Sequence, residues 1–400
     1  MNIQHIIEEG TYVEKGQYVA RLDPSDITTR IKDTQLELDE KQLFNLAKSK
    51  GIDVNNLQVD EMVDSSQGPF LAKDMEGGGR GSNSWVIASE KSETGRPILC
   101  NDTHLVLSMP GIWYMNHLNS KEGYHCTGYT IPGLPGLLLG HNGHITWGIT
   151  LAYTDVEDIF VEKLDVSNPE KYEYCGESQE FNVIEEIISI KGRGNHVEKI
   201  KQTVHGPLIG SVTEHSNKII ALCSKSLQPN TIMSGFFDIN QAENWDDFSF
   251  GVKKIKAPQL NIVYSDIKGN IGMYVSGRVP IRNKGGGDIP VPGWTGEYDW
   301  VSEIPHEEMP HILNPNCGFV ISCNNRITNN DYPHYLGNSF MNGYRASRIE
   351  EKFHELKKID YKSIQDLQMD MYSIPGKRIR DGLVAGLHTA KPKAQKLMDL

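Results

Sequence analysis

The stretch GGGRGSNSWVIA, residues 77–88, joins two parts of the chain that differ in their pattern of apolar and polar residues. Its glycines favour an exposed strand or loop, and the apolar run Trp85–Ala88 is typical of a buried strand. A serine at the first position of a chain can use its own α-amino group, with an ordinary pKa of about 7.7–8.0, as the base that activates its hydroxyl. Cleavage between Gly81 and Ser82 would create this arrangement. Taken alone, the same residues also suit a plain turn before a strand.

The composition is that of a globular protein. The 400 residues allow one large domain or two to three ordinary ones. Lys plus Arg is 40 and Asp plus Glu is 52, so the formal net charge is −12. This balance argues against a nucleic-acid partner, which needs clustered basic charge. No apolar run is long enough to span a membrane, and residues 1–10 lack the features of an export signal, so neither a membrane partner nor a signal peptide is expected.

Downstream of Ser82 the pattern predicts an α+β domain with large sheets. Short apolar runs alternate with Gly, Pro and Asn, which is typical of closely spaced strands. Helical spacing is confined to Ala242–Lys254, Ala346–Leu356 and much of Tyr361–Leu400. The last run, KAQKLMDL, has no helix cap, so we expect the domain to be cut short there.

Upstream of Ser82 the chain is organised differently. Residues 1–43 predict a β-hairpin that ends at Leu22, followed by a polar helix. The run GTYVEKGQYVARLD, residues 10–23, resembles the start of a HlyD-type membrane-fusion (efflux adaptor) protein. Residues 44–81 predict a linker or processing segment. Only 81 residues precede Ser82, so we expect truncation at this end too.

Six sequence blocks follow one another in an informative order. They are GSNSW (81–85), NDTHL (101–105), GHNGHITWGIT (140–150), LNIVYSDIKGNIG (260–272), PVPGWTGEYDW (290–300) and CNNR (323–326). In this order the sequence resembles the penicillin acylase family of N-terminal nucleophile hydrolases over residues 82–400. The resemblance implies the four-layer αββα fold, two antiparallel sheets between helical layers, with residues 82–400 as an incomplete catalytic domain like the acylase β-chain.

The resemblance also implies roles for five residues. Ser82 is the nucleophile and its freed α-amine is the base, so an acyl-enzyme forms and water hydrolyses it. His104, at 104 − 82 = 22 residues further on, matches a position whose backbone or imidazole steers the amine or the oxyanion. On its own it also reads as a turn histidine. The matched oxyanion donors are the Asn261 side chain and the Leu151 backbone N–H, and Arg282 matches an arginine that orders the asparagine and the amine.

An acidic run follows the strand that ends near Leu151. Asp155 and Asp158 match two carboxylates that hold calcium in many members, with a backbone carbonyl from Glu157 between them. Hard oxygen ligands at close spacing suit Ca²⁺. A short acidic run is also typical of a solvated surface. The resemblance implies no organic cofactor.

The implied activity is that of a hydrolase acting on linear amides other than peptide bonds. Its small-molecule substrate would resemble a penicillin, a cephalosporin or an acyl-homoserine lactone, and antibiotic metabolism is the associated process. The implied precursor is a zymogen that cleaves itself into α and β chains. Family members are often periplasmic or secreted, so the localisation stays open.

Which acyl group is accepted depends on pocket contacts. The apolar loop Met109–Tyr114 is the better candidate for that pocket, and Trp147 suits the core. The alternative is a fused or fragmentary protein, adaptor-like or inert, that never processes itself. The mass of the expressed chain would separate the two.

Overall fold

The computed structural model describes residues 3–6, 20–22, 81–105, 108–209, 219–228 and 232–387. The chain divides into two units, Met1–Ser65 with Arg378–Leu400, and Ser66–Lys377. In the first unit β1 (Ile3–Ile6) pairs antiparallel with β2 (Ala20–Leu22). The polar helix predicted before Leu43 lies outside the described residues. Apart from residues 378–387, every feature considered below lies in the second unit.

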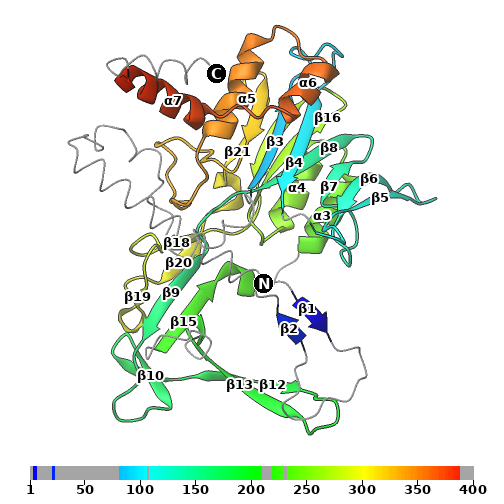
Figure 1. Cartoon of the computed structure of the whole chain (residues 1–400). Helices are drawn as coiled ribbons and strands as arrows, with labels where there is room; N and C mark the ends of the chain where they lie inside the picture. The colour runs from blue at the N-terminus through cyan, green and yellow to red at the C-terminus, as the bar shows by residue number, and fades with distance from the viewer. Residues whose placement is uncertain are drawn as a thin grey trace. The chain divides into compact units, whose positions relative to one another are not determined.

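Two antiparallel sheets form the centre of the second unit (Figure 1). The larger sheet has the strand order β21-β17-β16-β8-β7-β6-β5, and the smaller has the order β22-β3-β4. The strands of the larger sheet are β5 (Tyr114–Asn119), β6 (His125–Thr130), β7 (Leu139–His141), β8 (Ile145–Leu151), β16 (Leu260–Asp266), β17 (Ile271–Val275) and β21 (His311–Leu313). Those of the smaller sheet are β3 (Gly81–Ile87), β4 (Ile98–His104) and β22 (Phe319–Ser322).

The two sheets pack face to face and each carries helices on its outer face. Val86 of β3 packs between the sheets with Val263 and Val320. Its neighbours Trp85 and Ile87 point the other way, into a core shared with helices α5 (Tyr344–Glu355) and α6 (Tyr361–Gln368). Helices α3 (Ile232–Gln241) and α4 (Trp245–Lys254) cover the larger sheet. The predicted αββα order of layers is therefore confirmed.

Gly148 of β8, which lies within the block GHNGHITWGIT, lets the two sheets approach closely. A Cβ atom there would lie 2.8 Å from Ser84 Oγ and 3.0 Å from Asn101 Cβ. Asn101 bridges the sheets at this point: its Oδ1 accepts from Ile149 N–H at 2.8 Å, and its Nδ2 donates to Asn83 O at 2.8 Å and Ile149 O at 2.9 Å. These bonds satisfy polar groups that the sandwich would otherwise bury unpaired.

A second group of strands lies outside the sandwich. It contains β9 (Glu157–Glu162), β15 (Ile219–Ser224) and β19 (Val291–Pro292) in one sheet, and the pair β18 (Pro280–Arg282) and β20 (Trp300–Glu303). The remaining strands are β10 (Lys171–Tyr174), β11 (Glu177–Glu180), β12 (Asn182–Ile188), β13 (His196–Thr203) and β14 (Gly206–Pro207). The other helices are α7 (Ile374–Leu387) and the 3-10 turns Lys225–Leu227, Gly293–Thr295 and His306–Glu308. We call the part built on β9, β15, β18, β19 and β20 the β9 region.

Two local predictions differ from the structure. The N-D-T-H segment, which taken alone also suited a turn, is the end of β4. Helix α3 was not predicted, and Gly235 in its middle is the reason, because glycine disfavours helix. A Cβ atom on Gly235 would lie 2.7 Å from Gly251 O of α4, and one on Gly251 would lie 2.9 Å from Gly235 O. The two glycines therefore let α3 and α4 touch.

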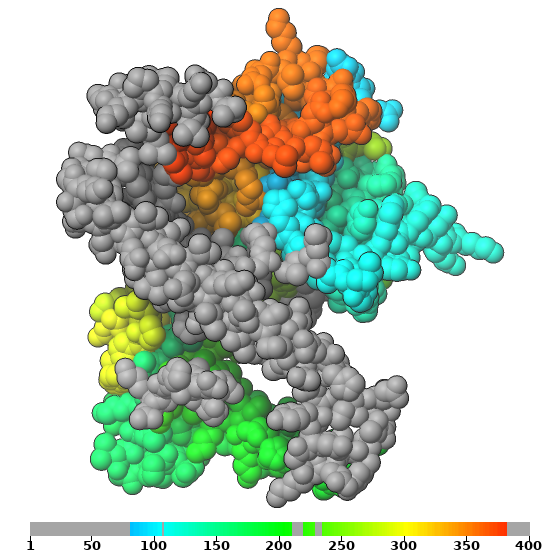
Figure 2. All heavy atoms as spheres, in the orientation of Figure 1, coloured from blue at the N-terminus to red at the C-terminus, as the bar shows by residue number. Residues whose placement is uncertain are grey.

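The β5–β6 hairpin projects from the edge of the larger sheet (Figure 1 and, in cyan at the right, Figure 2). Tyr114 and Met115 of β5 are exposed, as is Met109 in the loop before it. Among the described residues, no helix is long and apolar enough to cross a membrane.

Candidate active site

Ser82 is the second residue of β3 and is buried. It pairs in register with Thr103 of β4 and is 8% exposed. Because side chains alternate along a strand, its hydroxyl points between the two sheets, as Val86 does. The Ser82 Oγ donates to Gly81 O at 2.7 Å. The nucleophile predicted from sequence therefore lies against the carbonyl of the peptide bond that would be cut.

Asn324 holds the Ser82 nitrogen. The register of β22 with β3, which ends at Ser322↔Ser84, would place Asn324 opposite Ser82. Asn324 instead has a left-handed backbone with φ 63°, so the chain leaves the ladder. Asparagine tolerates this conformation better than most residues. Its side-chain Oδ1 accepts from Ser82 N–H at 2.6 Å, and its Nδ2 donates to Leu151 O at 2.9 Å.

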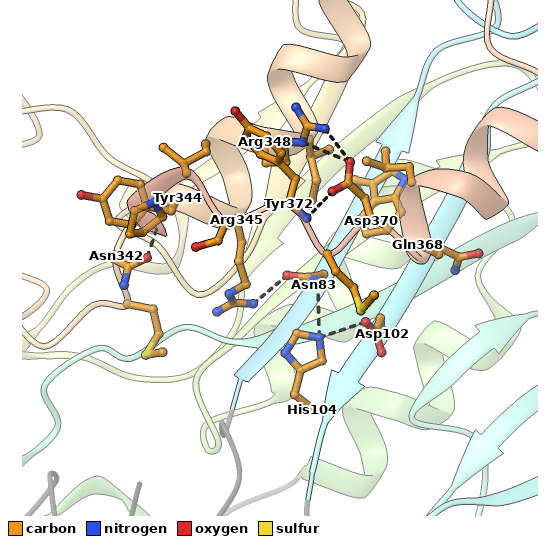
Figure 3. Close-up of a pocket in the computed structure, with 18 residues that line it drawn as sticks. Asn83, Asp102, His104, Asn342, Tyr344, Arg345, Arg348, Gln368, Asp370 and Tyr372 are labelled. Atoms are coloured by element: carbon orange, nitrogen blue, oxygen red, sulfur yellow. Dashed lines mark hydrogen bonds and ion pairs between the residues drawn. The ribbon is translucent and has the colours of Figure 1, made fainter. Parts of the chain in front are cut away.

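Arg345, near the start of α5, holds the Ser82 carbonyl. Its Nη1 donates to Ser82 O at 2.7 Å and to Asn83 Oδ1 at 2.6 Å. Its Nη2 donates to Asn324 Oδ1 at 3.1 Å. Figure 3 shows the guanidinium directed at Asn83 from the helix side of the small sheet. Arg345 and Asn324 together fix both main-chain polar groups of Ser82.

Asn261, the side chain that the resemblance implies as an oxyanion donor, lies fully buried between the sheets. Its Nδ2 donates to Thr150 Oγ1 at 3.1 Å and Ser322 Oγ at 3.0 Å, and these hydroxyls lie 2.7 Å apart. Its Oδ1 has no hydrogen-bond partner among the described residues. A buried amide oxygen without a partner is costly, and it marks this side chain as unusual among buried polar groups.

Leu151, the second predicted donor, ends β8 beside Asn261. Ala152 N–H bonds to Gln259 O, so Leu151 lies opposite Leu260 in the alternate, non-hydrogen-bonded pair. Its N–H therefore points away from β16. This orientation is compatible with donation to a bound group, while its carbonyl is taken by Asn324.

The imidazole of His104 lies on the opposite face of the small sheet from Ser82. Its Nε2 is 2.9 Å from Asp102 Oδ2 and 3.3 Å from Asn83 Nδ2. These side chains line a cavity of about 550 Å³ under α5 and α6 (Figure 3), and Ser82 is not among the residues that line it. Since His104 pairs in register with Gly81, its backbone, and not its ring, lies beside the Gly81–Ser82 bond.

Arg282 is not placed as the sequence predicted. We expected it to order Asn261 and the amine of Ser82, but its hydrogen bonds lie in the β9 region. Its Nη2 lies 3.1 Å from Asp155 Oδ1 and 2.7 Å from Asp158 Oδ1, and its Nε donates to Asp158 Oδ2 at 2.8 Å. The reason is that β18 pairs with β20 and so carries Arg282 to the acidic run. At Ser82, a guanidinium is supplied by Arg345.

The same contacts bear on the predicted calcium site. The guanidinium of Arg282 lies where a cation would meet Asp155 and Asp158, and Trp300 Nε1 donates to Asp158 Oδ2 at 2.6 Å. The Glu157 side chain accepts from Ser224 Oγ at 2.7 Å. Burial raises the pKa of Asp155 to about 6, although Arg282 opposes the rise. In the described ranges no group of three or more His, Cys, Asp or Glu side chains is placed to hold a metal. Asp155 and Asp158 do not fit calcium as they stand, because the guanidinium of Arg282 and the indole of Trp300 take up their oxygens.

Four residues of the site had no role assigned from sequence. Thr150 and Asn324 stood inside quoted blocks, and Ser322 immediately precedes one. Arg345 stood in none. For Thr150, Ser322 and Asn324 the sequence signal was their position in or beside a family block, whereas Arg345 had no such signal, because its contacts join positions far apart along the chain.

The architecture defines the class: a four-layer αββα protein with a serine poised at the start of a central strand. The model of the family described as penicillin amidase matches residues 12–400, and the chain belongs to this family. The match begins upstream of the acylase-like domain and includes most of the segment that resembles an adaptor. The adaptor resemblance and the domain boundaries stay predictions.

Individual proteins resemble the chain over most of its length. It is 34% identical to the acyl-homoserine lactone acylase QuiP of Pseudomonas aeruginosa, over 73% of this chain and 36% of that protein. It is 32% identical to the penicillin acylase 2 proenzyme of Pseudomonas sp. (strain SE83), over 76% and 40%, and 32% identical to penicillin G acylase of Escherichia coli, over 63% and 29%. These matches span 29% to 40% of the relatives' length.

A solved structure shows the same fold. The thermostable penicillin G acylase from Alcaligenes faecalis superposes with a TM-score of 0.66 and 22% identity, over 78% of this chain and 56% of that chain.

Proposed function

We propose that this chain is an amide hydrolase whose nucleophile is Ser82, exposed by cleavage of its own Gly81–Ser82 bond. The observation that carries the proposal is the position of Ser82 Oγ, 2.7 Å from Gly81 O and buried between the sheets. Membership of the penicillin amidase family supports it.

Self-cleavage starts from the contacts described at Ser82. Ser82 Oγ adds to the Gly81 carbonyl carbon, the C–N bond breaks, and the Ser82 nitrogen takes the hydroxyl proton. The product is an ester between Gly81 and Ser82 Oγ. Water hydrolyses that ester, which leaves a Gly81 carboxylate, a free Ser82 hydroxyl and a free α-amine. The result is two chains from one precursor.

Substrate hydrolysis would repeat this chemistry on a bound amide. The α-amine takes the Ser82 hydroxyl proton as Oγ attacks the carbonyl carbon, and it returns the proton to the departing amine. Water then hydrolyses the acyl ester. Asn261 and the Leu151 N–H are the proposed donors to the oxyanion.

The oxyanion role needs the NH₂ of Asn261 to face the reacting carbon. Rotation of the amide by 180° exchanges its two ends. The Thr150 and Ser322 hydroxyls share one proton in the bond between them, so one of the two can donate to Oδ1 after the rotation. The NH₂ group would then be available to the oxyanion, and the unpartnered Oδ1 would gain one bond.

We infer that the substrate is an acyl group joined by an amide to a small amine. The curated relatives are named as acylases of acyl-homoserine lactones and of penicillins. The loop before β5 is the candidate acyl pocket, because Trp113 Nε1 donates to Thr103 Oγ1 at 2.8 Å and so ties the loop beside Ser82. Ile112 in this loop and Leu151 are both partly exposed apolar side chains, and such side chains suit an acyl chain.

A panel of amides tests this function. Acyl-homoserine lactones of several chain lengths, penicillin G and a glutaryl amide are incubated with the protein, and the released amine is measured. We expect at least one to be hydrolysed, and Ser82→Ala to abolish the activity. Turnover by a folded Ser82→Ala variant would contradict the assignment. A wild-type chain that stays whole and hydrolyses none would favour the inert, unprocessed alternative.

A further inference from the structure

Two histidines meet on the exposed face of the β5–β6 hairpin, at the edge of the larger sheet (Figure 1). His117 of β5 and His125 of β6 are both exposed. Their Nε2 atoms lie 3.1 Å apart, the ring centroids are 5.2 Å apart, and the ring planes are inclined by 60°. The reaction proposed for Ser82 uses neither residue.

The register of the hairpin explains why the two rings meet. Thr127 lies opposite His117, and His125 lies opposite Asn119. Residues directly opposite each other share a face of the sheet, and so do residues two apart along a strand. His117 and His125 are therefore diagonal neighbours on one face, a separation that aromatic side chains can span. The strand pairing holds both Cβ atoms in place.

In the structure the contact is a hydrogen bond between two imidazoles. When both rings are neutral, one Nε2 donates a proton to the lone pair of the other. In the part of the chain that the structure describes, neither ring is paired with a carboxylate, and no hydrogen bond reaches either Nδ1. The proton on the donor ring can therefore move through solvent to its Nδ1. Both Nε2 lone pairs are then available, with no net release of a proton.

The separation of the two nitrogens suits two ligands on one metal ion. Metal–imidazole bonds are about 2.0–2.1 Å long, so two such nitrogens lie about 2.8–3.0 Å apart at a 90° angle and about 3.3–3.4 Å apart at the tetrahedral angle. The observed 3.1 Å falls between these values. The outer torsion of a histidine side chain is broad, so both exposed rings can turn their lone pairs towards one point.

We propose that His117 and His125 form a two-imidazole binding site for a divalent ion of the Cu²⁺, Ni²⁺ or Zn²⁺ kind. Imidazole suits these ions, whereas Mg²⁺ and Ca²⁺ prefer oxygen ligands. No third His, Cys, Asp or Glu among the described residues joins the pair. Water fills the remaining positions of the ion, as it does in metal sites that keep an open position.

The ion at this site is exchangeable. Partners that bond the second nitrogen of a ligating histidine typically raise metal affinity by about 10–100-fold. Within the described ranges the Nδ1 atoms of His117 and His125 have no such partner. Dialysis into metal-free buffer therefore empties the site, and every titration below starts from the metal-free chain.

The test compares metal binding by the wild type, His117→Gln, His125→Gln and the control His196→Gln. His196 is also exposed on a hairpin strand, and its Nε2 lies 3.0 Å from Glu198 Oε2. Among the described residues no second imidazole is bonded to it. Cu²⁺, Ni²⁺, Zn²⁺ and Mg²⁺ are titrated separately into each full chain by calorimetry. The electron paramagnetic resonance spectrum at one equivalent of Cu²⁺ reports the number of bound nitrogens.

We expect the wild type to bind Cu²⁺, Ni²⁺ and Zn²⁺ at one site that both variants weaken. The Kd should rise at least about tenfold in His117→Gln and in His125→Gln, because even the loss of an outer partner costs that much. Cu²⁺ should bind most tightly of the three, and Mg²⁺ should not bind there. The Cu²⁺ spectrum should show two imidazole nitrogens in the wild type. His196→Gln should match the wild type.

Wild-type affinity in either His117→Gln or His125→Gln would overturn the proposal, because one imidazole would then suffice. An equal loss in His196→Gln would overturn it as well, because the site would not be specific to the hairpin pair. If a variant does not fold, the wild-type spectrum decides: two nitrogens support the site, and one or none contradicts it. None of these outcomes bears on Ser82, so the site and the hydrolase function stand or fall separately.

Discussion

The surroundings of Ser82 and the β9 region bury polar groups in opposite ways. Around Ser82 the buried partners are hydroxyls and amides, and the cation Arg345 donates to neutral oxygens. In the β9 region each buried cation meets carboxylates: Arg282 meets Asp155 and Asp158, and His205 lies between Glu162 and Asp299.

The two arginines show what this difference means. Burial lowers the pKa of Arg345. Burial alone would also lower the pKa of Arg282, but the hydrogen bond to Asp158 and the charges of Asp155 and Asp158 raise it. A cancelled charge holds two elements together and has little effect beyond its partners. Among the described residues the hydrogen bonds of Arg345 reach no carboxylate, and they end on the Ser82 carbonyl and the Asn83 and Asn324 side-chain oxygens. Paired charges therefore hold the β9 region together, whereas the proposed reaction takes place at Ser82 in the sandwich.

The largest loss of stability should come from removing the Arg282 charge in the β9 region. Arg282→Gln leaves Asp155 and Asp158 without their cation, which should cost about 3–5 kcal/mol of unfolding free energy, because breaking a buried pair leaves an uncompensated charge. Arg278→Gln, which removes a partly exposed partner of Glu303, is the matched control and should cost about 1 kcal/mol or less. Urea unfolding measures both.

A chelator tests whether the carboxylates of Asp155 and Asp158 bind a metal. If Arg282 takes the place of a metal, EDTA should leave the Tm and the activity of the wild type unchanged. A Tm that falls with EDTA and recovers with Ca²⁺ would show that the acidic pair binds calcium after all.

Asn261→Ala tests the proposed oxyanion donor between the two sheets. The expected loss is about 10²–10³-fold in kcat with little change in KM, because the donor acts on charge that develops in the transition state. Stability should fall by about 1–3 kcal/mol as well, since Thr150 and Ser322 lose a partner. Normal kcat in the folded fraction would show that Asn261 is structural only.

Gly81→Ala probes the fit at the bond to be cut. A Cβ atom there would lie 3.1 Å from Arg345 Nη2 and 3.2 Å from Asn324 Oδ1. We expect slower self-cleavage, by about tenfold, because a crowded contact costs roughly 1–3 kcal/mol. Gly194→Ala, whose Cβ would meet nothing within 4 Å, is the control. Equal cleavage rates in a time course by mass would show that the contact has room to relax.

The smallest effect concerns His205. Burial lowers its pKa, but hydrogen bonds to Glu162 and Asp299 outweigh burial and raise it above the ordinary 6.5. The protonated ring therefore stabilises the folded state fully below about pH 6.5, and this contribution is lost as the pH rises through the folded pKa. His205→Gln should flatten the dependence of Tm on pH between about 6 and 8. An unchanged slope would remove His205 as its source.

Much of the fold could be predicted from sequence, and part of the site. Ser82, Asn261 and the layer order followed from blocks that are local along the chain. The position of Arg282 could not be predicted, because it depends on the pairing of β18 with β20. Both Arg282 and Arg345 were also available to supply the guanidinium near Ser82. Asn324 and Arg345 reach Ser82 from 242 and 263 residues away, and local pattern carries no information about such contacts.

The intact mass of the freshly expressed, folded chain tests the assignment of Ser82 most directly. We predict two fragments, the second starting SNSWVI at Ser82, for the wild type and for Ser84→Ala, and one uncut chain for Ser82→Ala. A folded wild type that remains whole, or a Ser82→Ala chain cut at the same bond, would contradict the assignment, because a methyl group cannot form the ester through which cleavage proceeds.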